Sequence, residues 1–210
     1  MSPTPGKRSS SGLRVRGSIT RPSVTPGVIL KTARRLFAQR GFDAVTVREI
    51  AAACGLTLPS IYHFFENKEQ LYRGCLAAVL EAAAQTLQAA LSEHASAHQR
   101  VERFTLALCT LLAEDGELLG FVQHENLRHP GWITASPLGP PLLACVELID
   151  SCDATPRGMH AAESILAHAL GQAIVRQAFG PAPWQAGSPD EIARSTRWIV
   201  TAACPDPAPK

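Results

Sequence analysis

The feature that most constrains the fold is a pair of short helical segments joined by a glycine, between Thr46 and Lys68. The first segment begins T-V-R-E, in which Thr46 and Glu49 have the spacing of a capping box, each side chain bonding the other's backbone N–H. Gly55 is expected to end this helix, because a residue without a Cβ adopts the left-handed conformation at little cost. A second helix follows at once, so the pattern predicts a helix-turn-helix.

The second helix of this pair has a polar beginning and an aromatic end. Its first turn, T-L-P-S over residues 57–60, tolerates proline because the first N–H groups of a helix have no intrahelical partner. Ile61, Phe64 and Phe65 follow at helical spacing and are expected to point inward. In a helix-turn-helix, the first residues of the second helix lie at base edges in the major groove. The polar turn is therefore expected to face DNA.

Charge is divided unevenly along the chain. The first 75 residues carry twelve basic and four acidic side chains, a net charge of +8, whereas the remainder carries eight basic and fourteen acidic ones, a net charge of −6. Such asymmetry is typical of a protein whose first third meets a polyanion. Charge alone leaves both nucleic acid and anionic lipid open as that polyanion.

Helical periodicity covers most of the chain after residue 24. Residues 1–24 are rich in Ser, Pro, Gly and Arg, so a disordered basic tail is expected there, acting either as an arm in the minor groove or only as a solubilising tail. No alternating strand pattern occurs, and the predicted fold class is all-α with about nine helices. Beyond the helix-turn-helix, helices are predicted over 25–41, 68–91, 96–113, 115–128, 139–153, 157–179 and 189–203.

Composition restricts the class of protein. Apolar residues make up 46% of the chain, enough for a substantial core, yet no run of about 18 uncharged apolar residues predicts a membrane span. No secretory signal is recognisable, so a cytoplasmic protein is expected. The six cysteines show no C-x-x-C spacing, which favours buried reduced thiols, with a redox sensor as the alternative.

The segment from Thr25 to about Leu71 resembles the tetracycline-repressor (TetR) family of transcriptional regulators. The matching signature is T-V-R-E-I-A, followed by C-G-L-T-x-x-S-I-Y-H-F-F-x-N-K-E-x-L. It covers less than a third of the chain, and the rest agrees only in length and helicity. The resemblance implies a helix-turn-helix DNA-binding domain over residues 25–72 and a helical ligand-binding and dimerisation domain over residues 73–204.

The resemblance also implies roles for individual residues. Thr46, Tyr62 and Lys68 stand at phosphate-contacting positions, and Arg48 is placed to reach a phosphate or a base edge, where a bidentate contact with guanine contributes about 1–3 kcal/mol of discrimination. Leu58 departs from the lysine of many relatives and is expected to contact a thymine methyl. The predicted DNA-binding residues are Thr46, Arg48, Thr57, Leu58, Pro59, Ser60, Tyr62, His63 and Lys68. The alternatives are a solvated charge for Arg48, a core aromatic for Tyr62 and a plain surface histidine for His63.

The middle of the chain is expected to supply a ligand pocket, because it mixes apolar walls with a few polar groups. The alternative is that its members are ordinary core and surface residues. The predicted pocket residues are Phe104, Cys109, Phe121, His124, Glu125, Arg128 and Trp132. His94 and His98 have the i, i+4 spacing of metal ligands, but no third ligand accompanies them, so neither a metal nor a cofactor is expected.

The resemblance places a homodimer interface in the helices near 157–179 and 189–203, where small residues flank an apolar stripe formed by Ile165, Leu166, Leu170, Ile174 and Val175. A two-fold dimer requires a near-palindromic operator in double-stranded DNA. The predicted function is a ligand-responsive regulator, a repressor released from DNA by a small-molecule inducer. The alternative is an architectural or partner-binding DNA-binding protein without an inducer. No catalytic motif was found, so no enzyme is expected.

Overall fold

The computed structural model describes residues 25–92, 94–152, 158–179 and 189–203, and within these ranges the chain is all-α, as predicted. The helices after residue 95 begin and end within one residue of the predicted bounds. The elements are α1 (Pro26–Ala44), α2 (Val47–Ala53), α3 (Leu58–Tyr62), α4 (Lys68–Ala90), α5 (Ala97–Glu114), α6 (Gly116–Arg128), a 3-10 turn η1 (Trp132–Ala135), α7 (Gly139–Cys152), α8 (Gly158–Phe179) and α9 (Pro189–Ala203).

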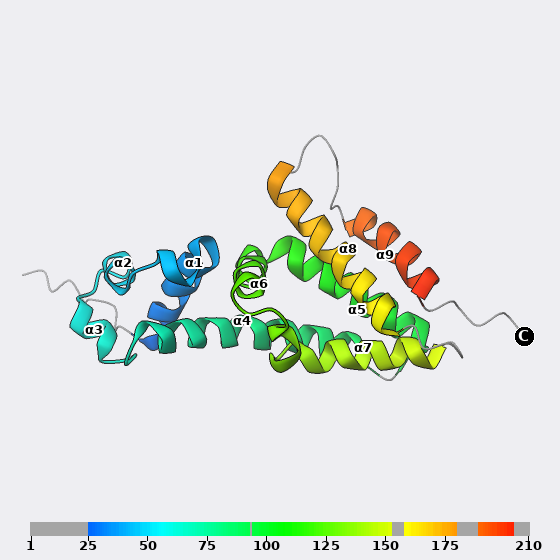
Figure 1. Cartoon of the computed structure of the whole chain (residues 1–210), viewed down its shortest axis with the longest axis horizontal. Coiled ribbons are helices and arrows are strands. Elements are labelled where there is room, and N and C mark those ends of the chain that lie inside the picture. The colour runs from blue at the N-terminus through cyan, green and yellow to red at the C-terminus, as the bar shows by residue number, and fades with distance from the viewer. Residues whose placement is uncertain (1–24, 93, 153–157, 180–188, 204–210) are drawn as a thin grey trace, which may run out of the picture.

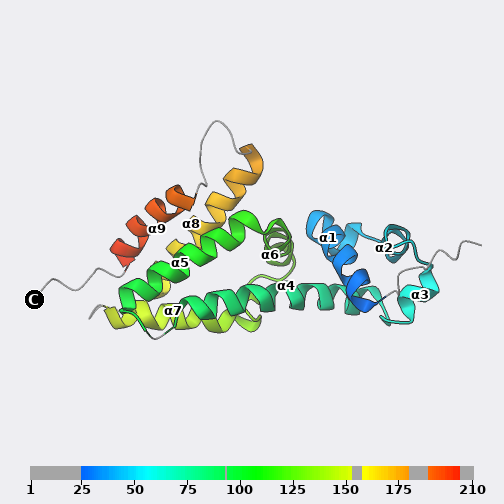
Figure 2. The same cartoon turned by 180° about the vertical axis from the view of Figure 1, so that it is seen from behind.

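The long helix α4 joins two groups of helices (Figures 1 and 2). Helices α1, α2 and α3 gather around its beginning, and α5, α7, α8 and α9 lie toward its other end. Helix α6 belongs to the second group in sequence, yet its most extensive packing is against α1 of the first group. The two groups are therefore connected by two routes, the continuous backbone of α4 and the packing of α6 on α1.

Two glycines allow α1 and α6 to come close. Gly41 interrupts the helical geometry of α1 with a φ of 76°, so the expected helix end falls at this glycine although helical turns continue to Ala44. A Cβ at Gly41 would lie 3.0 Å from Nδ1 of His124. On α6, a Cβ at Gly120 would overlap the carbonyl oxygen of Ala38, so only glycine fits without a shift of backbone.

One hydrophobic core extends from α1 through α4 into α6 and α5. At its centre, the Tyr72 ring lies edge-on to Phe37, with centroids 5.0 Å apart, and 5.6 Å from Phe121. Aromatic pairs at these distances add to the free energy of burial. An ion pair between Arg34 and Glu117 also joins α1 to α6 at the edge of this core. The two groups of helices are thus packed together and are not merely tethered.

Cys75, Cys109 and Cys145 are buried, and Cys54 is partly buried. Burial raises the pKa of the Cys75 and Cys145 thiols to about 12, and it also raises the pKa of Cys109. These three cysteines are therefore protonated, as the sequence predicted for buried thiols. The side chains of Cys152 and Cys204 lie outside the described residues. In the parts of the chain that the structure describes, none of the helices is both long and apolar enough to cross a bilayer.

Candidate nucleic-acid interface

Helices α2 and α3 form the predicted helix-turn-helix. Gly55 between them has a φ of 67°, and the N–H of Leu56 donates to the carbonyl of Ala51 over 2.8 Å, which closes the turn. No atom lies within 4 Å of a Cβ built on Gly55, so the backbone conformation alone requires glycine there. Ala51 is buried where α2 meets α3, as expected for a small residue at a close approach.

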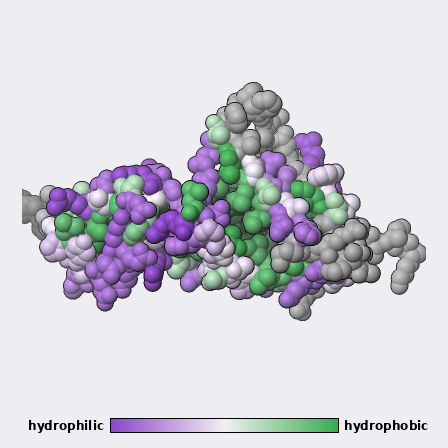
Figure 3. All heavy atoms as spheres, in the orientation of Figure 1, coloured by the Kyte–Doolittle hydropathy of each residue, from purple (hydrophilic) through white to green (hydrophobic). Residues whose placement is uncertain are grey.

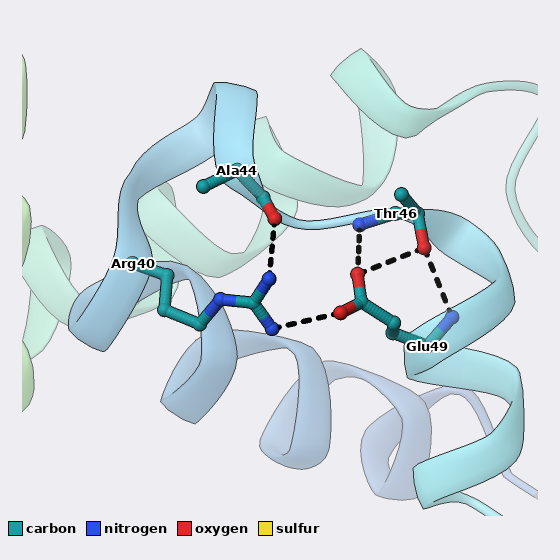
Figure 4. A network of polar contacts seen from close by, with 4 residues as sticks. All are labelled: Arg40, Ala44, Thr46 and Glu49. Carbon is teal, nitrogen blue, oxygen red and sulfur yellow. Dashed lines mark hydrogen bonds and ion pairs between the residues drawn. The ribbon is translucent and has the colours of Figure 1, made fainter.

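A hydrogen-bonded network fixes the corner between α1 and α2 (Figure 4). The predicted capping box is present, since the N–H of Glu49 donates to Oγ1 of Thr46 and the N–H of Thr46 donates to Oε2 of Glu49. Arg40 adds a bond to Oε1 of Glu49 over 2.9 Å and another to the carbonyl of Ala44 over 2.6 Å. The Thr46 N–H and the Arg40 guanidinium lower the pKa of Glu49 to about 2.

The hydroxyl of Thr46 is already used within this corner network. It donates to Oε2 of Glu49 over 2.8 Å while its oxygen accepts the Glu49 N–H. A hydroxyl has a single proton to donate. A phosphate contact from this donor would therefore have to replace the bond to Glu49, so Thr46 remains only a predicted contact.

The polar side of α3 is exposed. Tyr62 has 49% of its surface exposed, which excludes the alternative of a core aromatic, and Arg48, Pro59 and His63 are exposed as well. Ile61 is buried and Phe65 partly buried, as predicted. The side chains predicted to face DNA thus lie largely on the surface away from the core.

The prediction that Phe64 points inward is wrong. Its side chain is 36% exposed, its ring meets that of His63 with centroids 5.0 Å apart, and it lines a surface hollow of about 400 Å³ together with Leu56 and Pro59. The reason is that α3 ends at Tyr62, so Phe64 falls in the following turn, where helical periodicity no longer decides its direction.

The first turn of α3 differs in detail from the prediction. Thr57 stands at the N-cap, but its hydroxyl makes no cap bond and instead lies 2.8 Å from the hydroxyl of Ser60. Leu58 is partly buried and packs against the core, so only part of its side chain is available to a thymine methyl. Thr57 and Pro59 are the exposed residues of this turn.

Lys68 is the first residue of α4, where the helix dipole favours an anion. Asn67 caps this helix by accepting the N–H of Gln70 over 2.8 Å, and the Gln70 side chain in turn accepts the N–H of Glu66. The Lys68 ammonium lies 4.2 Å from the ring centroid of Phe42. Lys68 is therefore at the expected place, but it is partly buried and rests on an aromatic ring.

The seven predicted pocket residues do not converge on one cavity. Phe104 and Cys109 are buried in α5, and the Cys109 sulfur is 3.9 Å from the hydroxyl of Thr196 on α9. Trp132 is partly buried in the 3-10 turn η1. The other four, Phe121, His124, Glu125 and Arg128, lie on α6 at its junction with α1 and α4.

An enclosed cavity lies among α4 to α8 and η1 and is lined entirely by aliphatic side chains. Its volume is only about 20 Å³. The lining residues are Ala83, Leu87, Leu108, Leu111, Leu112, Leu118, Val122, Ile133, Leu138, Leu142, Leu166 and Leu170. A larger and open hollow of about 620 Å³ lies between α1, α4, α5 and α6, and Leu111 borders both spaces. Small-molecule sites have volumes of roughly 300–1,000 Å³.

Among the described residues, no group of three or more His, Cys, Asp or Glu side chains is arranged to hold a metal ion. His98 is buried in α5, whereas His94 is exposed before that helix begins. The two histidines with metal-ligand spacing therefore lie in different surroundings.

Two residues that join helices are not identified by local sequence patterns. Arg40 joins Glu49 across nine residues, a separation that no local pattern identifies. Tyr72 lies in the alanine-rich α4 and contacts Glu125 on α6, 53 residues away. The one feature of the sequence that distinguishes Tyr72 is that the chain has only two tyrosines.

Comparison with known proteins identifies the helix-turn-helix segment. The family model described as bacterial regulatory proteins, tetR family, matches residues 29–75. The HTH-type transcriptional repressor KstR2 of Mycolicibacterium smegmatis (strain ATCC 700084 / mc(2)155) is 40% identical over 52 residues, which are 25% of each protein. The matched segment spans a quarter or less of the length of the curated relatives.

Solved structures extend the likeness over most of the chain. AibR in complex with isovaleryl coenzyme A and operator DNA has a TM-score of 0.63 at 22% identity, over 86% of this chain and 98% of that one. FadR from Bacillus subtilis in complex with stearoyl-CoA has a TM-score of 0.61 at 15% identity, over 87% and 100%. At these identities the structures establish a shared fold. Residues 29–75 are therefore similar to the tetR family of bacterial regulatory proteins, and the chain shares its fold with a TetR-like transcriptional regulator from Rhodococcus sp. RHA1.

Proposed function

We propose that the chain is a DNA-binding transcriptional regulator. The observation that carries this proposal is the helix-turn-helix of α2 and α3, which buries Ile61 while it exposes Arg48, Tyr62 and His63. The net charge of +8 over the first 75 residues favours a nucleic acid as the partner of this surface. Lys68 at the start of α4 extends the same surface toward a phosphate.

The regulator is proposed to act as a homodimer through α8 and α9. Ala167, Gly171 and Ile174 follow one another at helical spacing on α8 and are all exposed, Ile174 by 46%. Trp198 on α9 is 74% exposed. Figure 3 shows hydrophobic residues gathered on the face where α8 lies. A second copy of the chain would cover these side chains, and the small residues would let two helices approach closely.

The predicted apolar stripe on α8 supports only part of that interface. Ile165 is buried within one chain, and Leu166 and Leu170 line the enclosed cavity. The side chain of Val175 lies outside the described residues. The proposed dimer face is therefore the exposed row of Ala167, Gly171 and Ile174 rather than the whole stripe.

The ligand proposed for the C-terminal domain is apolar or carries an apolar chain. The support is the enclosed cavity, whose lining has no polar side chain. An acyl chain would match this lining, and two neighbours of the same fold are titled as complexes with isovaleryl coenzyme A and stearoyl-CoA. The open hollow beyond Leu111 contains Arg34, Arg103 and Glu117 and would accept a polar head group. The cavity must widen before a chain of this kind enters it.

A second candidate function is a DNA-binding protein of the same fold that has no inducer. The observation that favours it is the size of the cavity, since about 20 Å³ holds roughly one water molecule. In that case the aliphatic interior is ordinary core, and acyl compounds have no effect on either stability or DNA binding.

DNA from the region that flanks the protein's own coding sequence tests the main proposal. We expect salt-dependent binding, and weaker binding by Arg48→Ala and Tyr62→Ala. Arg100→Ala is the control, since it removes a guanidinium from α5 outside the lining of the proposed ligand site. Fluorescence anisotropy across a series of salt concentrations measures these affinities. Equal affinity of Arg48→Ala, Tyr62→Ala and the parent protein would reject the assigned interface.

Thermal unfolding with acyl compounds separates the two candidates. A ligand at one hundred times its dissociation constant stabilises the folded protein by about 2.7 kcal/mol. Isovaleryl-CoA, stearoyl-CoA and free coenzyme A form a panel in which only the acyl chain differs. A rise in melting temperature that requires the chain, together with release of DNA, supports the inducer. No response to any member supports the second candidate.

A further inference from the structure

A buried carboxylate joins α6 to α4 at the boundary between the two groups of helices. Glu125 is only 5% exposed, and its Oε1 accepts the hydroxyl of Tyr72 over 2.5 Å and lies 3.3 Å from Nη1 of Arg128. A carboxylate is costly to bury unless it is paired and hydrogen-bonded. These partners therefore determine where the end of α6 lies relative to the beginning of α4.

Burial, together with the bond to Glu125, raises the pKa of Tyr72 well above its ordinary value. The phenol thus remains a hydrogen-bond donor. The overlap that a Cβ at Gly120 would make with Ala38 shows how closely α6 lies on α1. Helix α6 is consequently held to α1 by close backbone packing and to α4 by a directed hydrogen bond.

Arg128 connects this carboxylate to the predicted DNA-contacting surface. Its guanidinium lies 4.6 Å from the ring centroid of Phe42, and the ammonium of Lys68 lies 4.2 Å from the same centroid. Cation–π contacts of this length are attractive. One ring at the end of α1 therefore carries both a cation from α6 and the lysine predicted to contact a phosphate.

We propose that Glu125 and Arg128 are positioning residues that control the DNA contact of Lys68 from the C-terminal domain, through Tyr72 and Phe42. This inference rests on the proposed function, because it requires Lys68 to contact DNA. Neither α6 residue touches DNA in this scheme. The Tyr72 hydroxyl fixes the Glu125 carboxylate, and Glu125 orients Arg128. Arg128 then holds the Phe42 ring, and that ring places the ammonium of Lys68.

The same helix also forms part of the enclosed cavity. Leu118 and Val122 of α6 line it, whereas Glu125 and Arg128 lie one and two turns further along the helix at the junction with α4. A ligand that widens the cavity must displace α6 or its neighbours. Displacement of α6 would change the contact between Arg128 and Phe42, which provides a physical route from the cavity to Lys68.

A double-mutant cycle on DNA binding tests this inference, with a duplex from the region flanking the protein's own coding sequence as the probe. Lys68→Gln should lower the slope of log affinity against log salt by about 0.9, the value for one phosphate contact. Arg128→Gln should weaken binding about two- to fivefold, the equivalent of one ordinary cation–π contact, and should also lower the slope. In the Lys68→Gln background, Arg128→Gln should have no further effect.

Matched controls separate positioning from general damage. Arg100→Gln removes the same group from α5, outside the lining of the proposed ligand site, and should leave affinity and salt slope unchanged. Tyr72→Phe keeps the ring but removes the hydrogen bond to Glu125. Circular dichroism shows whether Arg128→Gln folds. If it does not fold, Tyr72→Phe replaces it in the double-mutant cycle with Lys68→Gln.

Two results would overturn the inference while leaving the proposed function intact. In the first, the parent protein binds DNA, and the losses of affinity caused by Arg128→Gln and Lys68→Gln multiply in the double variant. In the second, the Arg128→Gln protein folds and binds DNA with the same affinity as the parent protein. A parent protein without salt-dependent DNA binding would instead reject the proposed function itself.

Discussion

Two arginine–carboxylate pairs lie at junctions between helices of this protein, one exposed and one buried. At the α1–α2 corner, Glu49 receives Arg40 and the Thr46 N–H at the surface. At the α4–α6 junction, Glu125 receives Arg128 and the Tyr72 hydroxyl in the interior. Both carboxylates have similar partners, but only Glu125 is buried. Burial, rather than the number of bonds, is therefore expected to decide how much each pair contributes to stability.

The pairs also differ in what they join. The corner network connects neighbours in sequence, because Arg40, Ala44, Thr46 and Glu49 lie within ten residues (Figure 4). The junction connects Tyr72 to Glu125 over 53 residues. We therefore expect the corner to affect local geometry and the junction to affect the stability of the whole fold.

The largest effect is expected for Glu125→Ala. It leaves Arg128 and the Tyr72 hydroxyl without their acceptor, and breaking a buried pair costs about 3–5 kcal/mol. Urea unfolding should show this loss as a lower midpoint. Glu69→Ala is the matched control, since Glu69 pairs with the exposed Arg73 on α4 and its loss should have little effect. Equal losses for the two variants would contradict the importance of burial.

A smaller loss is expected for Gly120→Ala, which tests the backbone packing beside the buried pair. The new Cβ meets the carbonyl oxygen of Ala38, and such overpacking costs about 1–3 kcal/mol. Gly116→Ala on the same helix has no atom within 4 Å of its new Cβ and serves as the control. If Gly120→Ala is no less stable than Gly116→Ala in urea, the close packing of α6 on α1 at Gly120 is contradicted.

The smallest effect is expected at the exposed corner and depends on pH. The pKa of Glu49 is lowered from 4.5 to about 2, so its contribution to stability is complete above pH 4.5 and is lost as pH falls from 4.5 toward 2. Glu49→Gln should therefore be less stable than the parent protein at pH 6, and the difference should shrink by pH 3. Urea midpoints at the two pH values measure it. A difference that is constant with pH would show that the lowered pKa does not act through folding.

Local patterns were sufficient for the helices and for much of the candidate site. The capping box at Thr46 and Glu49, the turn at Gly55 and the cap at Asn67 are each set by residues within four positions of one another. Phe64 marks where this reasoning fails. Its helical spacing predicted burial, but α3 is too short to carry the period that far.

The residues predicted for a ligand pocket show a different limit. Phe121, Glu125 and Arg128 were selected because they mix apolar and polar chemistry, and the structure places that mixture at a junction between helices. The enclosed cavity is instead lined by aliphatic residues that look like any other core in sequence. Residue type indicates which side chains can make polar contacts, but it does not indicate which helix each side chain faces.

The all-α class, the helix-turn-helix and the division of charge follow from the amino-acid sequence, because helix periodicity and capping depend on neighbouring residues and net charge is a simple sum. The packing of α6 on α1, the contact of Tyr72 with Glu125, and the Phe42 ring shared by Arg128 and Lys68 are visible only in the folded chain. These contacts join residues far apart in the chain, and their partners are set by how whole helices pack.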